Sequence, residues 1–172
     1  MIQLYYGDGK GKTTAAAGAS VRAAGRGRQV WFAQFMKGQE SGELAVFSKV
    51  EGIRVLRCGH DFPFFRIMTE AEKKELMQIH NRMLEKILTA LQKGQTDFVV
   101  LDEITHACRF ELADTELLER ILESGKGEGT EILLTGRSPS RHLLEVSDYI
   151  TEMQCIRHPY EKGVLARRGV EL

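Results

Sequence analysis

Residues 7–14 read GDGKGKTT and follow directly on a short apolar run at residues 2–6. The three glycines at alternate positions lack a Cβ, so this backbone can turn tightly and point successive N–H groups at one anion. Residues 14–24 are nearly all small and predict a helix, whose N-terminus adds a positive dipole end. Strand, glycine-rich loop and helix in this order predict a site for the phosphates of a nucleoside triphosphate.

Two side chains of this loop carry specific expectations. Lys12 would reach the outer phosphates, and the Thr13 hydroxyl would hold a magnesium ion. The loop is one residue shorter than the usual signature, and Tyr6 stands where an outer glycine is expected. An ordinary glycine-rich turn that binds nothing is the alternative, but the order of the surrounding elements argues against it. The shortened loop suggests that the phosphates lie differently from those of ordinary ATPases.

Size and composition predict one domain over residues 1–172, large enough to bury a core. Acidic residues and Lys plus Arg residues each number 24, so we expect neither nucleic acid nor a membrane surface as a partner. No apolar run is long enough to span a bilayer, and the chain opens on an expected core strand, which favours a cytoplasmic location. The three cysteines are expected to be reduced, buried thiols.

Apolar runs alternate with helical patterns, which predicts an α/β fold resembling the P-loop NTPases. The sheet is expected to be mostly parallel, with helices on both faces. The predicted strands cover residues 2–6, 29–35, 53–56, 98–101, 131–134 and 149–153, and the predicted helices cover residues 14–24, 69–94, 114–123 and 141–146. In such folds ligands bind beyond the carboxyl ends of the strands.

Two further groups of polar residues follow predicted strands. Asp102 and Glu103 end an apolar run, where a carboxylate binds magnesium directly or through water, opposite Thr13. The residues alone leave open which carboxylate is the direct ligand. Arg137 follows another strand and would pair either with phosphate oxygens or with a nearby glutamate at the surface.

Two other segments have less regular patterns. Residues 31–38 read WFAQFMKG, in which the aromatic residues are expected in the core and Lys37 is expected in solvent. Residues 58–65 read CGHDFPFF, with neither helical nor strand periodicity. An aromatic-rich loop of this kind favours a binding surface. His60 has no partners at metal-ligand spacing, so we do not expect it to hold a metal.

Taken together, these motifs resemble the P-loop ATP:corrinoid adenosyltransferases over nearly the whole chain. The shared segments are residues 7–14, QFMKG at 34–38, VLDE at 100–103, LTGR at 134–137, SDYITEM at 147–153, RHPY at 157–160 and GVLARRGVE at 163–171. Two departures stand out: Asp8 replaces the usual Asn, and Phe62-Pro63-Phe64 replaces a Phe-Thr-Trp segment. The N-terminal extension of some relatives has no counterpart before the first strand.

The resemblance implies that a reduced Co(I) corrinoid, cob(I)alamin or cob(I)yrinic acid a,c-diamide, attacks the 5′ carbon of ATP and expels triphosphate. It implies Lys12 and Arg137 as catalytic residues, and Phe62 and Phe64 as a wedge that excludes the lower axial ligand of cobalt. For magnesium it implies Thr13 with Glu103 as direct ligands, ahead of Asp102. An electron-donating reductase, expected to be a flavoprotein, and a homodimer are the implied partners. The expected ligand-binding residues are Gly7, Asp8, Gly9, Lys10, Gly11, Lys12, Thr13, Thr14, Phe62 and Phe64.

Three other functions remain open on the sequence. A small P-loop kinase or ATPase would release ADP or phosphate instead of triphosphate, although no arginine-rich lid segment is apparent. A nucleotide or corrinoid carrier would bind without turnover. A nucleic-acid motor fits poorly with the balanced charge and the short chain.

Overall fold

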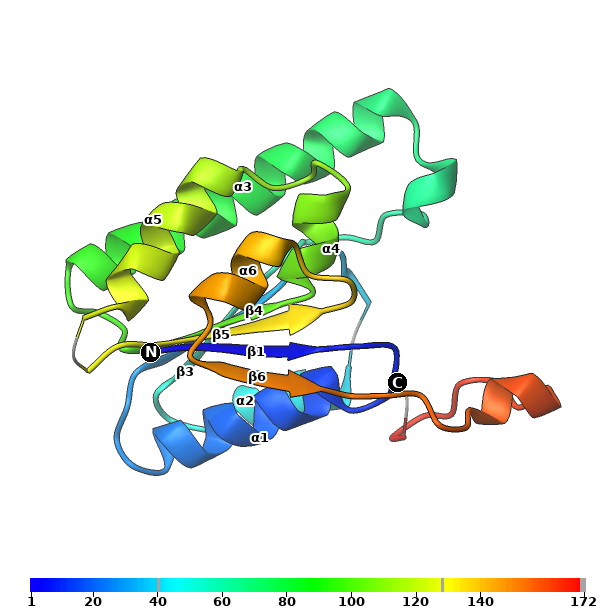
Figure 1. Cartoon of the computed structure of the whole chain (residues 1–172), viewed down its shortest axis with the longest axis horizontal. Coiled ribbons are helices and arrows are strands. Elements are labelled where there is room, and N and C mark those ends of the chain that lie inside the picture. Colours follow the sequence, from blue (N-terminus) through cyan, green and yellow to red (C-terminus); the bar gives the residue numbers. More distant parts are fainter. Residues whose placement is uncertain (40, 128, 171–172) are drawn as a thin grey trace.

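The computed structural model describes residues 1–39, 41–127 and 129–170, so the final position of the 163–171 motif lies outside it. Its strands are β1 (Ile2–Tyr6), β2 (Val30–Gln34), β3 (Ile53–Arg57), β4 (Phe98–Asp102), β5 (Glu131–Gly136) and β6 (Tyr149–Glu152) (Figure 1). Its α-helices are α1 (Lys12–Ala24), α2 (Gly42–Phe47), α3 (Glu70–Gln92), α4 (Ile104–Arg109), α5 (Thr115–Gly125) and α6 (Arg141–Val146). Two 3-10 turns are η1 (Phe65–Ile67) and η2 (Pro159–Lys162).

The strands form one sheet in the order β3-β2-β4-β5-β1-β6, and every neighbouring pair is parallel. The predicted α/β class is therefore confirmed. A parallel sheet brings all its carboxyl ends to one edge. Only β5 separates β1, which leads into the glycine-rich loop, from β4, which ends in the acidic pair.

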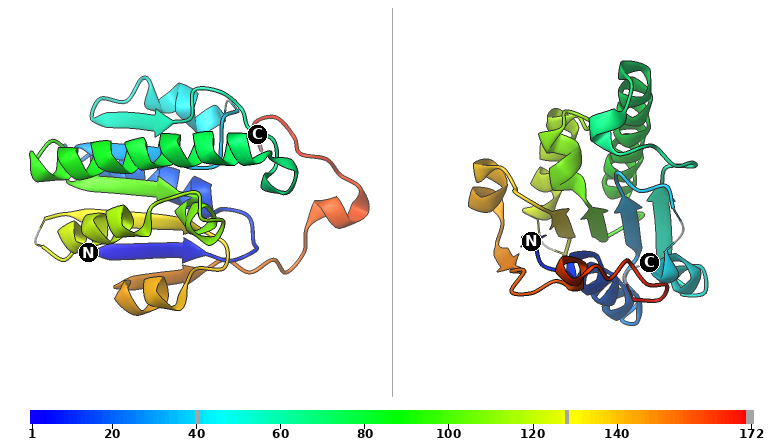
Figure 2. Two further views of the ribbon diagram at one scale, coloured as in Figure 1. Left: turned by 90° about the horizontal axis from the view of Figure 1, so that it is seen from above. Right: turned by 90° about the vertical axis from the view of Figure 1, so that its right-hand side faces the viewer.

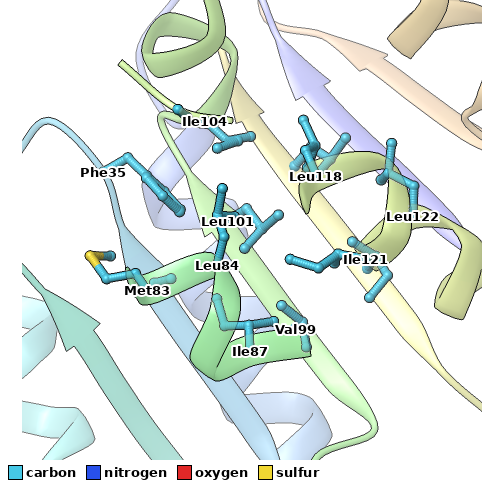
Figure 3. Close-up of a cluster of buried hydrophobic side chains, with 14 of the residues drawn as sticks. Phe35, Met83, Leu84, Ile87, Val99, Leu101, Ile104, Leu118, Ile121 and Leu122 are labelled. Carbon is cyan, nitrogen blue, oxygen red and sulfur yellow. The ribbon is translucent and has the colours of Figure 1, made fainter. Parts of the chain in front are cut away.

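Alternation along the buried strands assigns side chains to two apolar layers. Val99 and Leu101 of β4 pack in a cluster with α3 and α5, whereas Phe98 and Val100 pack with α1 and α2. Figure 1 shows these helix groups on opposite faces of the sheet, and Figure 3 shows the layer beneath α3 and α5. Successive side chains of a strand point to opposite faces of the sheet, and here both faces are apolar. Helices therefore cover the sheet on both sides.

Helix α3 is the longest element and its start matches the expected signal. The Thr69 side chain accepts a hydrogen bond from the Glu72 amide, and the Glu72 carboxylate accepts one from the Thr69 amide. This reciprocal pair satisfies two of the N–H groups that a helix start leaves unpaired. Apolar residues at helical spacing, including Leu84 and Ile87, then bury one face of the helix against the sheet.

Some boundaries differ from the prediction. Helix α1 begins at Lys12, two residues earlier than expected, because Gly11 takes a left-handed conformation that starts the helix directly after the loop. The six-residue helices α2 and α4 were not predicted, although the equally short α6 was. Fewer than two turns leave little periodicity, so helices of this length are recognised unevenly.

The cysteines are free thiols, but they are not all buried. Cys58 is buried, Cys108 is half-buried and Cys155 is exposed, so the expected burial was wrong for Cys155. Burial raises the pKa of Cys58 and Cys108 to about 11, which keeps both protonated. Within the described ranges, no helix is both long and apolar enough to cross a membrane.

Candidate functional site

A cleft of about 1170 Å³ opens at the carboxyl ends of the strands, where ligands were expected. Figure 2 shows the chain after β6 running out beyond these strand ends and turning back toward them. The glycine-rich loop, the segments after β2, β4 and β5, the aromatic loop and this C-terminal tail all contribute to the lining. Each predicted site residue lines the cleft except Gly7 and Asp102, which are buried.

The Lys12 side chain is folded back onto its own loop. Its ammonium donates a hydrogen bond to the Gly9 carbonyl over 2.7 Å, and the residue is only 7% exposed. Burial lowers the pKa of Lys12, and the Arg137 charge lowers it further, although Glu103, Asp8 and Asp102 oppose both effects. The ammonium is thus held at the wall of the cleft by one carbonyl that a phosphate oxygen can replace.

The start of the C-terminal tail, directly after β6, is hydrogen-bonded to the glycine-rich loop. The Gly9 amide donates to the Met153 carbonyl over 2.6 Å, and the Met153 amide donates to the Tyr6 carbonyl over 2.7 Å. A Cβ on Gly9 would lie 2.6 Å from the Met153 oxygen, so this position requires glycine. The expectation that successive loop N–H groups all face one anion is therefore wrong for Gly9, because its N–H faces the tail.

A buried carboxylate lies at the centre of the predicted metal site. The Asp102 side chain is completely buried and accepts hydrogen bonds from Thr13 over 2.9 Å and from Thr135 over 2.6 Å. Thr135 belongs to β5, the strand between the two motifs, and its hydroxyl also accepts the Glu103 amide. Thr135 was not singled out from the sequence, because its role depends on the strand order.

Lys37 completes this network, contrary to the expectation that it is solvated. Its ammonium lies 2.9 Å from the Asp102 Oδ2 and 3.0 Å from the Thr13 hydroxyl. Burial alone would lower the pKa of Lys37, but the adjacent Asp102 charge and hydrogen bond outweigh it and raise this pKa. The preceding residue, Met36, has a φ of 60°, a left-handed turn that no local sequence pattern predicts.

Glu103 borders the cleft one residue beyond Asp102. It adopts a left-handed conformation at the start of α4, and its carboxylate pairs with His106. Burial raises the pKa of Glu103, but the His106 hydrogen bond and the positive charges of Lys37 and Lys12 lower it below its ordinary value. Glu103 therefore presents a carboxylate at the cleft, whereas Asp102 lies beneath the Thr13 hydroxyl.

Arg137 lies at the rim and is half-exposed. Its guanidinium is 4.0 Å from the Asp8 carboxylate, so the predicted ion pair exists, but with an aspartate of the glycine-rich loop instead of a glutamate. Because both side chains face water, the pair is weak and can exchange for another anion. Lys10 and Thr14, the remaining polar residues of the loop, are also exposed at the cleft.

The aromatic loop forms the opposite wall. Phe64 is 88% exposed, whereas Phe62 is half-buried against the ring of His60, at a centroid distance of 4.5 Å. His60 also lies 3.6 Å from Glu75. Across residues 1–39, 41–127 and 129–170, no three His, Cys, Asp or Glu side chains cluster as a metal site.

A stack of rings behind this loop was missed from the sequence. Phe65 stacks on Phe110 with centroids 4.1 Å apart and planes 7° from parallel, and Phe110 lies parallel to His106 at 5.9 Å. His106 in turn pairs with Glu103. The stack joins the aromatic loop to the edge of the predicted metal site, across 45 positions of sequence that no local pattern connects.

One buried acceptor near the site has no hydrogen-bond partner within the described part of the chain. Gln34 at the end of β2 donates from its amide nitrogen to Glu43 over 3.4 Å, but its side-chain oxygen is buried without a hydrogen bond among the described residues. Gln34 lies opposite Asp102 in the strand register. An orphaned buried acceptor here suits a water or ligand donor.

The donor set fits magnesium. Mg²⁺ is bound in nucleotide sites by one or two carboxylates, a hydroxyl, waters and phosphate oxygens, so it needs no cluster of three acidic residues. Thr13 and Glu103 supply such oxygens at the cleft, and Asp102 accepts a hydrogen bond from the Thr13 hydroxyl. The Lys37 ammonium already lies against the Thr13 hydroxyl and the Asp102 carboxylate.

Comparison with known proteins gives a consistent result. The family model for ATP:corrinoid adenosyltransferase BtuR/CobO/CobP matches residues 1–172. The chain is 32% identical over 174 residues to a corrinoid adenosyltransferase of Sinorhizobium sp, covering 99% of this chain and 79% of the relative. It is 29% identical over 171 residues to the corrinoid adenosyltransferase CobA of Salmonella typhimurium, covering 99% and 85%.

The fold also resembles a solved structure. The KaiC-like protein PH0186 from Pyrococcus horikoshii OT3 superposes with a TM-score of 0.55, over 89% of this chain and 70% of that one. The two sequences are 18% identical. This likeness supports the P-loop type of α/β fold alone.

Proposed function

This chain belongs to the ATP:corrinoid adenosyltransferase family, and we propose that it transfers the 5′-deoxyadenosyl group of ATP to the Co(I) of a reduced corrinoid. One observation carries the assignment to this site: the glycine-rich loop and the exposed aromatic loop line the same cleft. A phosphate-binding wall facing an apolar wall suits a reaction between a nucleotide and a large, partly apolar macrocycle.

In this proposal Thr13 and Glu103 hold magnesium, and Asp102 acts through the Thr13 hydroxyl. Exposure distinguishes the carboxylates, because Glu103 lines the cleft whereas Asp102 is buried below Thr13. When bound, magnesium neutralises negative charge on the triphosphate. The protein's own contribution is to keep both oxygens oriented before the nucleotide arrives.

The chemical step is a displacement at carbon. The cobalt electron pair forms the Co–C5′ bond, the C5′–O bond breaks, and its electron pair leaves on the triphosphate. Since the cobalt has no proton to lose, no general base is needed. Lys12 and Arg137 would stabilise the charge that grows on the leaving oxygen, exchanging the Gly9 carbonyl and Asp8 for phosphate oxygens.

The aromatic loop would prepare the corrinoid. Phe64 projects almost fully into solvent, and Phe62 is anchored beside it. An apolar wedge at this wall would exclude the lower axial ligand of cobalt, which eases reduction to Co(I). Electrons would come from a separate reductase, which we expect to be a flavoprotein in the cytoplasm. We also propose that residues 1–172 act as one domain and that the protein works as a homodimer.

Product analysis tests this function. The protein would be incubated anaerobically with Mg·ATP and chemically reduced cob(I)alamin, with visible spectra for the light-sensitive Co–C bond and phosphorus NMR for the other product. Stoichiometric triphosphate and adenosylcobalamin are expected. ADP or phosphate would instead indicate a kinase or ATPase, and tight ATP binding without product would indicate a carrier.

A further inference from the structure

His80 is a buried histidine that contacts two distant segments. It lies on α3, is fully buried, and its ring is edge-on to Phe35 at 5.1 Å. The Met36 amide donates to its Nε2 over 3.2 Å, and its Nδ1 lies 2.8 Å from the Leu112 carbonyl. A buried polar side chain in the apolar layer is costly unless both its nitrogens are satisfied, as they are here.

These two partners determine the state of the ring. An amide can only donate and a carbonyl can only accept, so Nε2 must be bare and Nδ1 must carry the proton. Burial agrees with a neutral ring, because it lowers the pKa of His80 to about 4. The Met36 amide therefore has one acceptor, and that acceptor is the imidazole.

Met36 connects this ring to the nucleotide site. Its φ of 60° is unfavourable for a residue with a Cβ and persists only where neighbouring structure holds it. The turn aims the next residue, Lys37, back over the sheet edge to Thr13 and Asp102. Without the turn, a side chain following β2 would continue past the edge of the strands.

We propose that His80 is a positioning residue for nucleotide binding: by accepting the Met36 amide, it holds the turn that places Lys37 on the Thr13–Asp102 pair. This inference rests on Mg·ATP occupying the cleft, as in the proposed function, but not on the chemistry that follows. The ring touches no substrate, so its effect should reach the site only through residues 36 and 37.

Two isosteric variants separate this role from ordinary packing. In His80→Gln the side-chain oxygen lies near the position of Nε2 and can still accept the Met36 amide. In His80→Asn the side-chain nitrogen lies near the position of Nδ1 and can still donate to Leu112, but the Met36 amide is left unpaired. Both variants lose one hydrogen bond and shorten or reshape the same buried group, so both should lower the melting temperature.

Mg·ATP affinity, measured by calorimetry without corrinoid, is the deciding quantity. We expect the Kd to rise about tenfold in His80→Asn and to stay within about threefold in His80→Gln, since one buried donor is orphaned only in the former. In a Lys37→Met background, His80→Asn should change the Kd by less than about twofold. Equal Kd values for the two His80 variants, or a full effect of His80→Asn without Lys37, would overturn the proposal.

A wild-type measurement keeps the proposal testable if His80→Asn fails to fold. Nitrogen-15 NMR of the imidazoles at neutral pH should give a neutral, Nδ1-protonated ring for His80, with surface His142 as the reference. An Nε2-protonated ring would overturn the proposal. Adenosylcobalamin formation is scored separately in the wild-type protein, so a failure of the proposed reaction cannot be confused with a failure of the His80–Met36 link.

Discussion

The Lys37 ammonium lies 2.9 Å from the Oδ2 of Asp102, and it is the cation that compensates this fully buried carboxylate. The Lys37 side chain is one-third exposed, so a ligand in the cleft can contact its ammonium. The Asp102 side chain is completely buried and cannot be contacted from the cleft. An ion pair of this kind adds little net stability when intact but is costly to break on one side, because the remaining charge is left without water or a counterion.

Removing only Lys37 should therefore destabilise the protein. We expect Lys37→Met to lower the free energy of unfolding by about 3 kcal/mol, measured by urea denaturation with magnesium chelated. Adding Asp102→Asn should recover more than half of this loss, because it removes the orphaned charge. A double variant as unstable as the sum of the two single variants would contradict this account.

Lys12 should matter for function far more than for folding. Lys12→Met removes a buried cation that donates one hydrogen bond, to the Gly9 carbonyl, within the described part of the chain, so the free energy of unfolding should change by less than about 1 kcal/mol. If Lys12 stabilises the departing triphosphate, kcat/KM for adenosyl transfer should fall by about 10² or more. Lys74→Ala, an exposed lysine on α3, is the control and should match the wild type in both assays.

Stability should depend on pH through His80. The unfolded chain binds a proton at this group near pH 6.5, whereas the folded protein does so only near pH 4. The unfolded state therefore binds more protons between these values, and stability falls as the pH drops through this window. From pH 7 to pH 5 this amounts to roughly 2 kcal/mol.

Urea unfolding at pH 7, 6 and 5 tests this sign and size. The His80→Gln variant lacks the titrating ring, so its stability should fall less steeply than that of the wild type. The free energies of unfolding of the wild type and of His80→Gln should therefore lie roughly 2 kcal/mol closer together at pH 5 than at pH 7. A difference that does not change with pH would mean that the folded ring takes up its proton at an ordinary pKa.

Phe64 allows the wedge to be tested without disturbing the fold. Because its side chain is 88% exposed, Phe64→Ala should change the free energy of unfolding by no more than about 0.5 kcal/mol. Adenosylation that starts from cob(II)alamin and a reductant should slow severalfold, whereas adenosylation of chemically prepared cob(I)alamin should slow less. Ile156→Ala, equally exposed but outside the cleft lining, is the matched control. Equal slowing with both corrinoid forms would contradict a role in reduction.

Much of the site could be predicted because its chemistry is carried by contiguous motifs. Residues 7–14 and the strand ending in Asp102 indicate the phosphate loop and the acidic edge, and continuous apolar runs such as residues 98–101 indicate strands that are buried on both faces. What escaped prediction depends on long-range geometry. Lys37 reads as a solvated lysine until the left-handed Met36 turns it inward, and Thr135 matters only because β5 lies between β1 and β4.

The ring stack and the hydrogen-bond partner of the Gly9 amide escaped prediction for the same reason. Phe65 and Phe110 stack although neither neighbourhood has a periodic signal, and the Gly9 N–H is taken by residue 153. Local propensity says nothing about partners so distant in sequence.

The bond between the Gly9 amide and the Met153 carbonyl also bears on how the protein matures. The phosphate loop is translated before its outer brace, which comes from a segment about 140 residues further along the chain. Because β1 lies between β5 and β6 in the sheet, neither this strand nor the loop after it has its partners until these later segments have been made. The braced form of the phosphate loop is therefore a late product of folding, because it needs β6 docked beside β1.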